Sequence, residues 1–458
     1  MFKKILIANR GEIALRIIRA CRELQIPTVA VHSEVDENAL HVRFADESVC
    51  IGPASPALSY LNIPAIIAAA EITGADAIHP GYGFLSENSE FATVCGDCGL
   101  TFIGPTPENM QQWGDKIQAR QLAERLGLPL SKGSGLLRDV QDAVAQAKAI
   151  GYPVMLKAAG GGGGRGMQIV RSNENMLRVF ASARAEALAG FRNGDLYCER
   201  FVEEPRHIEF QVVCDTQRNV RVLGERECTI QRRHQKLLEE APSVAVSAEL
   251  RNDMASTISR AMRESGYVSL GTLEFLMDEK GSLSFMEMNT RVQVEHPVTE
   301  LITGVDLVTE QILIAAGQVT SIPDGLLSPR GHAIECRINA EDPQTFAPSP
   351  GLIHEYHPPG GAGIRVDSGV YGGWRVPSHY DSLLFKVIAH SRNRTDAIAR
   401  MRRALSETIV SGIRTNVRLH QFILQNPDFV SGKFSTRFID QCGLSSIAAL
   451  NIDFPLHS

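Results

Sequence analysis

The chain has 458 residues, of which 44% are hydrophobic and 21% charged, and its formal net charge is −6. This length predicts two to four compact domains, because a single core stops growing at about 250–300 residues. The acidic balance excludes a general nucleic-acid surface. The start of the chain has no apolar segment or cleavage site of a secretory signal, and no apolar run is long enough to span a membrane. We therefore expect a cytoplasmic protein with no nucleic-acid or membrane partner.

The first third alternates short apolar runs with amphipathic helical patterns, which predicts a doubly wound parallel sheet. Ligands of such sheets bind beyond the carboxyl ends of the strands, where residues 8–12 and 79–88 lie. A single glycine, Gly11, follows the first strand, which argues against a dinucleotide site. The expected strands are 3–8, 28–33, 75–80 and 100–105, and the expected helices are 11–24, 63–74 and 87–99.

Five consecutive glycines, 160–164, separate the expected strands 152–158 and 167–170. A loop of this kind lacks side-chain packing, but its bare backbone amides can approach phosphate oxygens closely. It is not a Walker A loop, because the lysine precedes the glycines and no Gly-Lys-Ser/Thr follows. The pattern indicates a mobile flap that closes on phosphates.

Three lysines in motif-like stretches, Lys116, Lys157 and Lys236, are candidates for binding phosphates as point charges. The alternative is that each is a solvated surface lysine, which is the commoner fate of a single lysine.

A hairpin is predicted from arms at 269–278 and 282–289, joined by a turn at 279–281. It would bring Glu274 and Glu287 together, with Asn289 on the same side. Two carboxylates and a carboxamide suit Mg²⁺. The alternative is a pair of glutamates at a sheet edge that face solvent.

The stretch after the hairpin carries Arg291, Gln293 and Glu295 at alternate positions, which predicts that they share one face. An arginine fork suits a small planar oxyanion, and Glu295 could remove a proton from it. The cations of 229–243 could instead form an RNA-binding patch, but no aromatic residues lie among them. Together these features predict phosphoryl transfer to a small oxyanion.

With these residues established, nearly the whole chain up to about residue 440 resembles the biotin carboxylases, the ATP-grasp subunits of bacterial acetyl-CoA carboxylases. The motifs that carry the resemblance are ANRGEIALRIIRAC, HPGYGFLSEN, KAAGGGGGRGM, ERECTIQRRHQKLLEEAPS, GTLEF, EMNTRVQVEHPVTE and ECRINAEDP. In that family ATP phosphorylates bicarbonate to carboxyphosphate, whose CO₂ passes to deprotonated biotin.

The resemblance implies an α/β chain, α+β overall, with three domains. These would be a doubly wound parallel N-terminal biotin carboxylase domain (1–114), an ATP-grasp domain (115–328) with a mobile glycine-rich lid at about 131–203, and a mixed or antiparallel C-terminal domain (329–446).

It also implies a role for particular residues. ATP would be bound by Lys116, Lys157, Gly163, Gly164, the adenine-side stretch Glu199, Arg200, Phe201 and Val202, and the ribose-side His207, Gln231 and His234. Mg²⁺ or Mn²⁺ would be bound by Glu274, Glu287 and Asn289. Bicarbonate would be bound by Lys236, Arg291, Gln293 and Val294, with Glu295 as its base. Biotin would lie near Tyr82, Gly83 and Arg337, with Arg337 stabilising the charge on its oxygen.

Three positions depart from the family pattern: Ala159, Arg200 and Val244 stand where Ser, Lys and Pro are usual. Cys228 lies beside a cationic stretch that could lower the pKa of its thiol, although a structural thiol is the favoured interpretation. No lysine follows a methionine as in a biotinyl domain, so biotin is expected on a separate carrier protein, with carboxyltransferase subunits as further partners. A homodimer is also implied, to which Arg16, Arg19 and Glu23 could contribute.

Two other functions compete with a biotin carboxylase. Another ATP-grasp ligase would share the nucleotide residues, but the stretches 79–88 and 335–342 argue against it. A catalytically silent nucleotide-binding subunit would lack a metal ligand or the base, and neither is missing.

Overall fold

The N-terminal sheet has five strands in the order β3-β2-β1-β4-β5, and all neighbours run parallel. The computed structural model describes residues 1–160, 166–323 and 327–443. The expected doubly wound sheet is confirmed. Strand β3 was not predicted, because its residues are mostly exposed and show no apolar run. The strands are β1 (Ile5–Ile7), β2 (Thr28–His32), β3 (Glu47–Cys50), β4 (Ala77–His79) and β5 (Thr101–Phe102).

Helix α1 (Gly11–Glu23) has the buried face that its apolar spacing predicts: Ala14, Ile17, Ile18 and Cys21 are fully buried. The helix packs against the C-terminal strands β17 (Ile364–Ser368) and β19 (Leu383–Ser391) as well as α11 (Leu307–Ala315), so it joins regions that are distant in sequence. The other helices of this region are α2 (Leu40–Phe44), α3 (Ile63–Thr73), α4 (Ser89–Asp97) and α5 (Pro107–Gly114), with single 3-10 turns η1 (Glu34–Asp36) and η2 (Pro56–Leu58).

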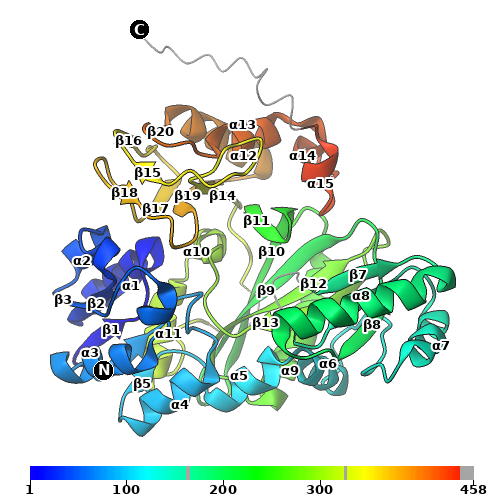
Figure 1. Ribbon diagram of the computed structural model, residues 1–458. Coiled ribbons are helices and arrows are strands. Elements are labelled where there is room, and N and C mark those ends of the chain that lie inside the picture. The colour runs from blue at the N-terminus through cyan, green and yellow to red at the C-terminus, as the bar shows by residue number, and fades with distance from the viewer. Residues whose placement is uncertain (161–165, 324–326, 444–458) are drawn as a thin grey trace.

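A small three-stranded sheet, ordered β7-β6-β8, follows helix α6 (Lys116–Arg125) and lies at the right of Figure 1. It has a hydrophobic core of its own, in which Leu156, Phe180 and Leu196 take part. The strands are β6 (Val154–Ala158), β7 (Met167–Val170) and β8 (Leu196–Arg200), and the helices packed on them are α7 (Val140–Ile150) and α8 (Asn173–Phe191).

The largest sheet has eight strands in the order β13-β12-β9-β10-β11-β14-β19-β17, and every neighbouring pair is antiparallel. Because β11 pairs with β14, the C-terminal strands continue the central sheet instead of forming a separate one. The strands are β9 (Arg206–Cys214), β10 (Val220–Arg232), β11 (Gln235–Ala241), β12 (Ser269–Met277), β13 (Leu283–Asn289), β14 (His332–Asn339), β17 (Ile364–Ser368) and β19 (Leu383–Ser391).

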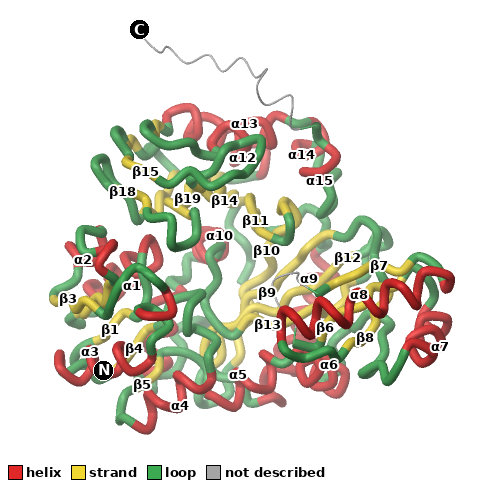
Figure 2. Tube along the Cα trace, viewed as in Figure 1, coloured by secondary structure: helices red, strands yellow, loops and turns green. Residues whose placement is uncertain are grey.

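Helix α10 (His296–Thr303) lies where the three regions meet, and it packs against β10, β11, β14 and β19 (Figures 1 and 2). The remaining helices are α9 (Ala248–Ser265), α11 (Leu307–Ala315), α12 (Arg394–Glu407), α13 (Val417–Gln425), α14 (Pro427–Val430) and α15 (Phe438–Gln441). The remaining strands are β15 (Gly351–Leu352), β16 (Tyr356–His357), β18 (Arg375–Val376) and β20 (Ile409–Val410).

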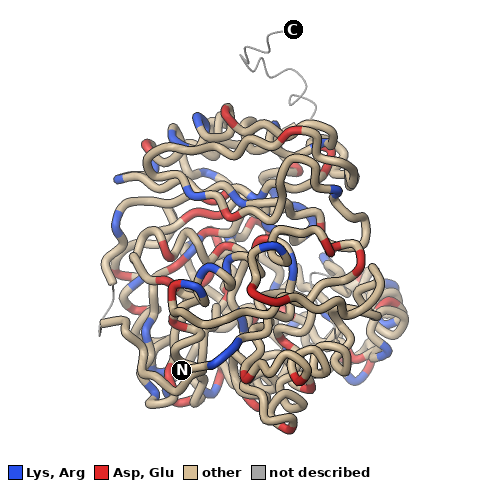
Figure 3. The backbone as a smooth tube through the Cα atoms, turned by 90° about the vertical axis from the view of Figure 1, so that its left-hand side faces the viewer, with Lys and Arg blue, Asp and Glu red and all other residues tan. Residues whose placement is uncertain are grey.

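In the described residues no helix combines the length and apolarity that crossing a bilayer requires. Positive and negative residues are interspersed in the view of Figure 3, with no large region of one sign. All nine cysteines are free.

Candidate active site

Lys236 on β11 is the centre of a buried polar cluster. Its Nζ lies 2.6 Å from Glu209 Oε2, 2.9 Å from Glu274 Oε1, 2.6 Å from Glu295 Oε1 and 3.3 Å from Gln293 Oε1. Burial disfavours the charged ammonium, but the three carboxylates outweigh it and hold the pKa of Lys236 well above its ordinary value. Lys236 is therefore a cation at neutral pH. The residues of the cluster come from three strands and one loop.

Glu209 is balanced by a second cation, Arg226, whose side chain is fully buried on β10. Arg226 Nε donates to Glu209 Oε1 at 2.5 Å, and its Nη atoms donate to Gln211, Thr272 and Thr299 at 2.8–3.1 Å. A buried guanidinium is costly unless its donors are satisfied, and here they are. Arg226 thus fixes one side of the carboxylate cluster.

Glu295 is held between two cations. Its Oε1 accepts from Lys236, and its Oε2 accepts from Arg337 Nη2 at 3.0 Å. Arg337 on β14 also donates through Nε to Glu239 Oε1 at 2.6 Å. Burial alone would raise the pKa of Glu295, but Lys236, Arg337 and Arg226 hold it well below its ordinary value. Glu295 is therefore an ionised carboxylate at neutral pH.

The predicted hairpin forms, and its register places Glu274 directly opposite Glu287. Asn289 Nδ2 donates to Glu274 Oε1 at 2.8 Å, and Lys116 Nζ lies 3.8 Å from Glu287 Oε2. Glu274 is buried, whereas the Glu287 side chain on the edge strand is 37% exposed. Two carboxylates and a carboxamide at one end of the hairpin are hard oxygen donors that fit Mg²⁺.

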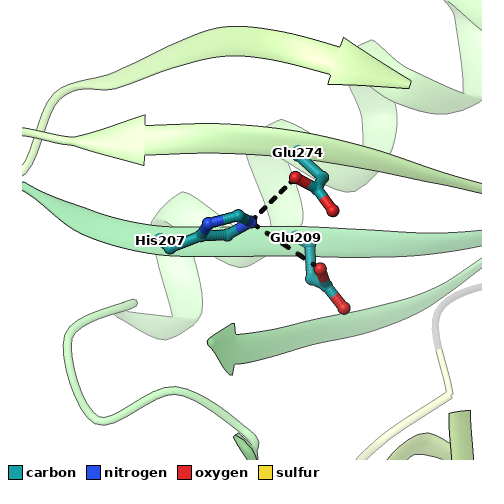
Figure 4. A group of neighbouring side chains, drawn as sticks. All are labelled: His207, Glu209 and Glu274. Atoms are coloured by element: carbon teal, nitrogen blue, oxygen red, sulfur yellow. Dashed lines mark ion pairs between the residues drawn. The ribbon is translucent and has the colours of Figure 1, made fainter. Parts of the chain in front are cut away.

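His207 lies next to Glu274 and Glu209, as Figure 4 shows. Its Nε2 is 3.0 Å from Glu274 Oε2 and 3.8 Å from Glu209 Oε2. These three side chains together have metal-ligand spacing. A cation bound among them would compete with the Lys236 ammonium for the same carboxylates.

The alternation predicted for Arg291, Gln293 and Glu295 is wrong, because this segment forms no strand. It turns from β13 into α10, whose first turn contains Pro297. Gln293 and Glu295 both still reach Lys236. Arg291 instead donates to Glu87 Oε2 and Asn289 Oδ1, both at 2.9 Å.

The residues that were expected to bind the nucleotide fall in two groups. Lys157 Nζ on β6 lies 2.7 Å from Glu199 Oε2 on β8, and Arg120 holds the other oxygen of Glu199 at 3.1 Å. Gln231 is at the end of β10, and His234 is in the turn to β11, where Arg233 and His234 both have positive φ. Arg200 is exposed, while Phe201 and Val202 are half-buried. Gly163 and Gly164 lie outside the described residues.

Tyr82 and Gly83 follow β4 at the carboxyl end of the parallel sheet, where ligands of such sheets bind. The Tyr82 hydroxyl donates to Glu12 Oε1. Gly83 is exposed and has a φ of +68°. Tyr82 is thus bound to α1 of the N-terminal region.

Family models match three parts of the chain: the biotin carboxylase N-terminal domain over residues 1–110, the ATP-binding domain of the carbamoyl-phosphate synthase L chain over 115–322, and the biotin carboxylase C-terminal domain over 335–441. The biotin carboxylase of Nostoc sp. is 55% identical over 442 residues, which cover 96% of this chain and 99% of that protein. This chain belongs to the biotin carboxylase family.

Solved structures agree with this assignment to the biotin carboxylases. A Campylobacter jejuni biotin carboxylase in complex with an ATP ligand has a TM-score of 0.93 at 46% identity, covering 96% of this chain and 99% of that one. The biotin carboxylase domain dimer of Hydrogenobacter thermophilus 2-oxoglutarate carboxylase, in complex with MgADP, ADP and bicarbonate, has a TM-score of 0.93 at 49% identity and covers 98% of both chains. The expected family, ATP-grasp fold and ATP-dependent ligase class are confirmed.

Cys228 behaves as a structural thiol in this biotin carboxylase. It is fully buried, and its Sγ is 3.9 Å from Glu295 Oε1. Burial raises the pKa of the Cys228 thiol well above its ordinary value. The neighbouring carboxylates of Glu209 and Glu295 raise this pKa further, whereas Lys236 lowers it. The nearby cations therefore do not activate it.

Two of the positions at which this chain departs from the family pattern are Ala159 and Val244. Ala159 donates its backbone N–H to the Asp195 carbonyl at 2.9 Å, and Val244 is exposed. Arg16, suggested for a dimer contact, is buried against Glu300 and Asp306 at 3.0 and 2.6 Å.

Three buried charged residues of the cluster, Glu209, Arg226 and Glu239, were not predicted from the sequence. The buried Lys386, which lies outside the cluster, and Glu87, whose side chain is 40% exposed, were not predicted either. Glu209 and Lys386 each lie in a strand of mainly apolar residues, as Glu274 does. The same criterion that selected Glu274 would have found both.

Glu239 should make stability depend on pH. Burial raises the pKa of Glu239 from its ordinary value of 4.5 to about 7, although Arg337 lowers it. The folded protein then retains a proton that the unfolded chain releases. This contribution is present below pH 4.5 and is lost as pH rises through 7. A Glu239→Gln variant should therefore lose less stability than the wild type between pH 5 and pH 7, by about 2 kcal/mol. Urea unfolding at pH 5, 6, 7 and 8 measures this, and equal pH slopes would contradict it.

Proposed function

We propose that this chain uses ATP and bicarbonate to carboxylate biotin through carboxyphosphate, the first half-reaction of acetyl-CoA carboxylase in fatty acid synthesis. The observation that supports it best is the ionised Glu295 carboxylate, which lies between Lys236 and Arg337 and beside the acid pair of Glu274 and Glu287. This chemistry requires a base, an anion-binding cation and a metal-ligand pair close together.

In the first step bicarbonate would bind to Lys236, Arg291, Gln293 and the Val294 N–H. Glu295 would take its proton, since this carboxylate is ionised and contacts Lys236. The bicarbonate oxygen thus freed of its proton would attack the γ-phosphorus of ATP. The new bond gives carboxyphosphate as the bond between the γ-phosphorus and the β–γ bridging oxygen breaks, and ADP leaves.

On the nucleotide side, Lys116 and Lys157 would bind the phosphates of ATP, with Gly163 and Gly164 closing over them. The stretch from Glu199 to Val202 would face the adenine, and His207, Gln231 and His234 the ribose. Glu274, Glu287 and Asn289 would hold Mg²⁺ or Mn²⁺, which when bound neutralises phosphate charge.

Biotin would bind between the N-terminal and C-terminal regions. Arg337 would stabilise the negative charge on its ureido oxygen, and Tyr82 and Gly83 would line the same space. Arg337 is placed for this, because its guanidinium reaches Glu295.

For organisation and partners, we propose the division 1–114, 115–328 with a lid at about 131–203, and 329–446. We also propose a cytoplasmic homodimer that receives biotin on a separate carrier protein and works with carboxyltransferase subunits. The dimeric Hydrogenobacter thermophilus domain supports the homodimer.

ADP release by the purified chain tests the proposal, measured with MgATP and bicarbonate and with or without free biotin. We expect bicarbonate-dependent release that biotin stimulates and that EDTA abolishes. Turnover indifferent to biotin would indicate another acceptor, and tight MgATP binding without turnover would indicate a silent subunit.

A further inference from the structure

Lys386 on β19 is a fully buried lysine that lies outside the carboxylate cluster around Lys236. Its Nζ donates to the Val294 carbonyl at 2.7 Å. It also lies 3.2 Å from Glu12 Oε1 and 3.8 Å from Asp367 Oδ2. A buried ammonium is costly, so these contacts must hold it in one position.

Lys386 and two of its partners come from three different regions of the chain. Glu12 is on α1 of the N-terminal region, Val294 lies between β13 and α10, and Lys386 belongs to the C-terminal strand β19. Glu12 Oε1 also accepts the hydroxyl of Tyr82. A continuous series of contacts therefore runs from Tyr82 through Glu12 and Lys386 to the Val294 carbonyl.

The Val294 carbonyl belongs to the peptide unit that ends at the nitrogen of Glu295. Because a peptide unit is planar and rigid, holding this oxygen also fixes the direction in which the Glu295 backbone leaves it. Glu295 is the N-terminal boundary residue of α10, with a φ of −83° and a ψ of 10°. Lys386 thus acts on the residue whose carboxylate contacts Lys236 and Arg337.

Other charged groups face Lys386 as well, but they are engaged or uncharged. Asp367 is bound by both Arg365 Nε and Nη2, at 2.9 and 2.8 Å. Glu335 on β14 is fully buried, and neither carboxylate oxygen has a hydrogen-bond partner among the described residues. Burial raises the pKa of Glu335 well above its ordinary value, which favours its neutral form. Glu12, at 3.2 Å, is the nearest carboxylate to the Lys386 ammonium among the described residues.

Resting on the proposed function, we infer that Lys386 is a positioning residue that sets both substrate sides of the active site: the Val294–Glu295 peptide on the bicarbonate side and, through Glu12, the Tyr82 ring on the biotin side. One buried ammonium then couples the geometry of the two sides, because both depend on where its nitrogen lies. The residue touches neither substrate.

A Lys386→Met variant keeps the length of the side chain and removes its charge. We expect the KM for bicarbonate to rise about tenfold and kcat to fall, while the Kd of MgATP stays within twofold of the wild type. The exposed Lys433→Met variant is the matched control and should behave as wild type. Should Lys386→Met fail to fold, Glu12→Gln, which keeps the shape of the carboxylate, should raise the KM values for bicarbonate and biotin.

Two further measurements separate positioning from general destabilisation. The effect of Tyr82→Phe on the biotin KM should be smaller in a Glu12→Gln or Lys386→Met background than in the wild type, because the contact series is already broken. Amide hydrogen exchange in residues 290–300 should be faster in Lys386→Met than in Lys433→Met.

Any of three results would overturn the inference: an unchanged bicarbonate KM in a folded Lys386→Met protein, additive effects with Tyr82→Phe, or unaltered exchange in residues 290–300. Bicarbonate-dependent turnover by the wild type would still uphold the proposed function in that case. Absence of bicarbonate-dependent turnover in the wild type would instead overturn the proposed function. Hydrogen exchange would still decide whether Lys386 holds this segment.

Discussion

A Lys236→Met variant should lose ATP turnover by about 10²–10³-fold or more, because it loses the donor that is placed to bind the reacting anion. It also leaves Glu209, Glu274 and Glu295 without the ammonium that all three contact within 2.9 Å. Arg226 and Arg337 still partly compensate two of them. The loss of a buried partner should lower the free energy of unfolding by about 3–5 kcal/mol.

Turnover is measured by ADP release, and stability by urea unfolding at pH 7. The matched control is Lys280→Met, since Lys280 is exposed in the turn between β12 and β13. A Lys236→Met protein with wild-type stability would show that the three carboxylates tolerate one another and would contradict the ion-pair interpretation.

The second large effect is expected for Glu295→Gln. The amide has almost the same shape but cannot accept the proton from bicarbonate, so turnover should fall by about 10²–10⁴-fold. The Kd of MgATP should stay within a few-fold of the wild type, because Glu295 contacts Lys236, Arg337 and Cys228 and none of the proposed nucleotide residues.

Glu310→Gln is the matched control for this change. Glu310 is also a buried glutamate, but it binds Thr320 and Ser321 in a different part of the fold. Its turnover should equal that of the wild type. Turnover by Glu295→Gln within tenfold of the wild type would exclude Glu295 as the base.

The features predicted correctly from the sequence depend on short-range patterns. The 3.6-residue spacing of 11–24 determines which face of α1 is buried, and the turn at 279–281 joins the two arms that carry Glu274 and Glu287. A register shift between Glu274 and Phe275 then brings Glu274 opposite Glu287. In both cases the residues that interact lie within one helix or one hairpin. Local geometry is then sufficient to place them.

The unpredicted features depend on strand order. Lys236 on β11 contacts Glu209 on β9 across the intervening strand β10, so the contact depends on the order of these strands in the sheet. Lys236 also contacts Glu295, because α10 packs against the same sheet. No spacing within β11 indicates either neighbour. Arg291 was expected to share a face with Glu295 by strand alternation, but the chain leaves the sheet after Asn289. The resemblance to the biotin carboxylases assigned roles to Lys236, Arg291 and Glu295 but did not predict which residues they contact.

The pairing of β11 with β14 also limits how the chain can be divided. In a fragment that ended at residue 328, Leu238 to Ala241 would lose the strand that now covers them. Their backbone donors and acceptors would form an open sheet edge, which is a template for joining other chains. Such a truncated product should therefore aggregate on expression. A useful fragment for crystallisation or screening must retain at least the strands that close this edge.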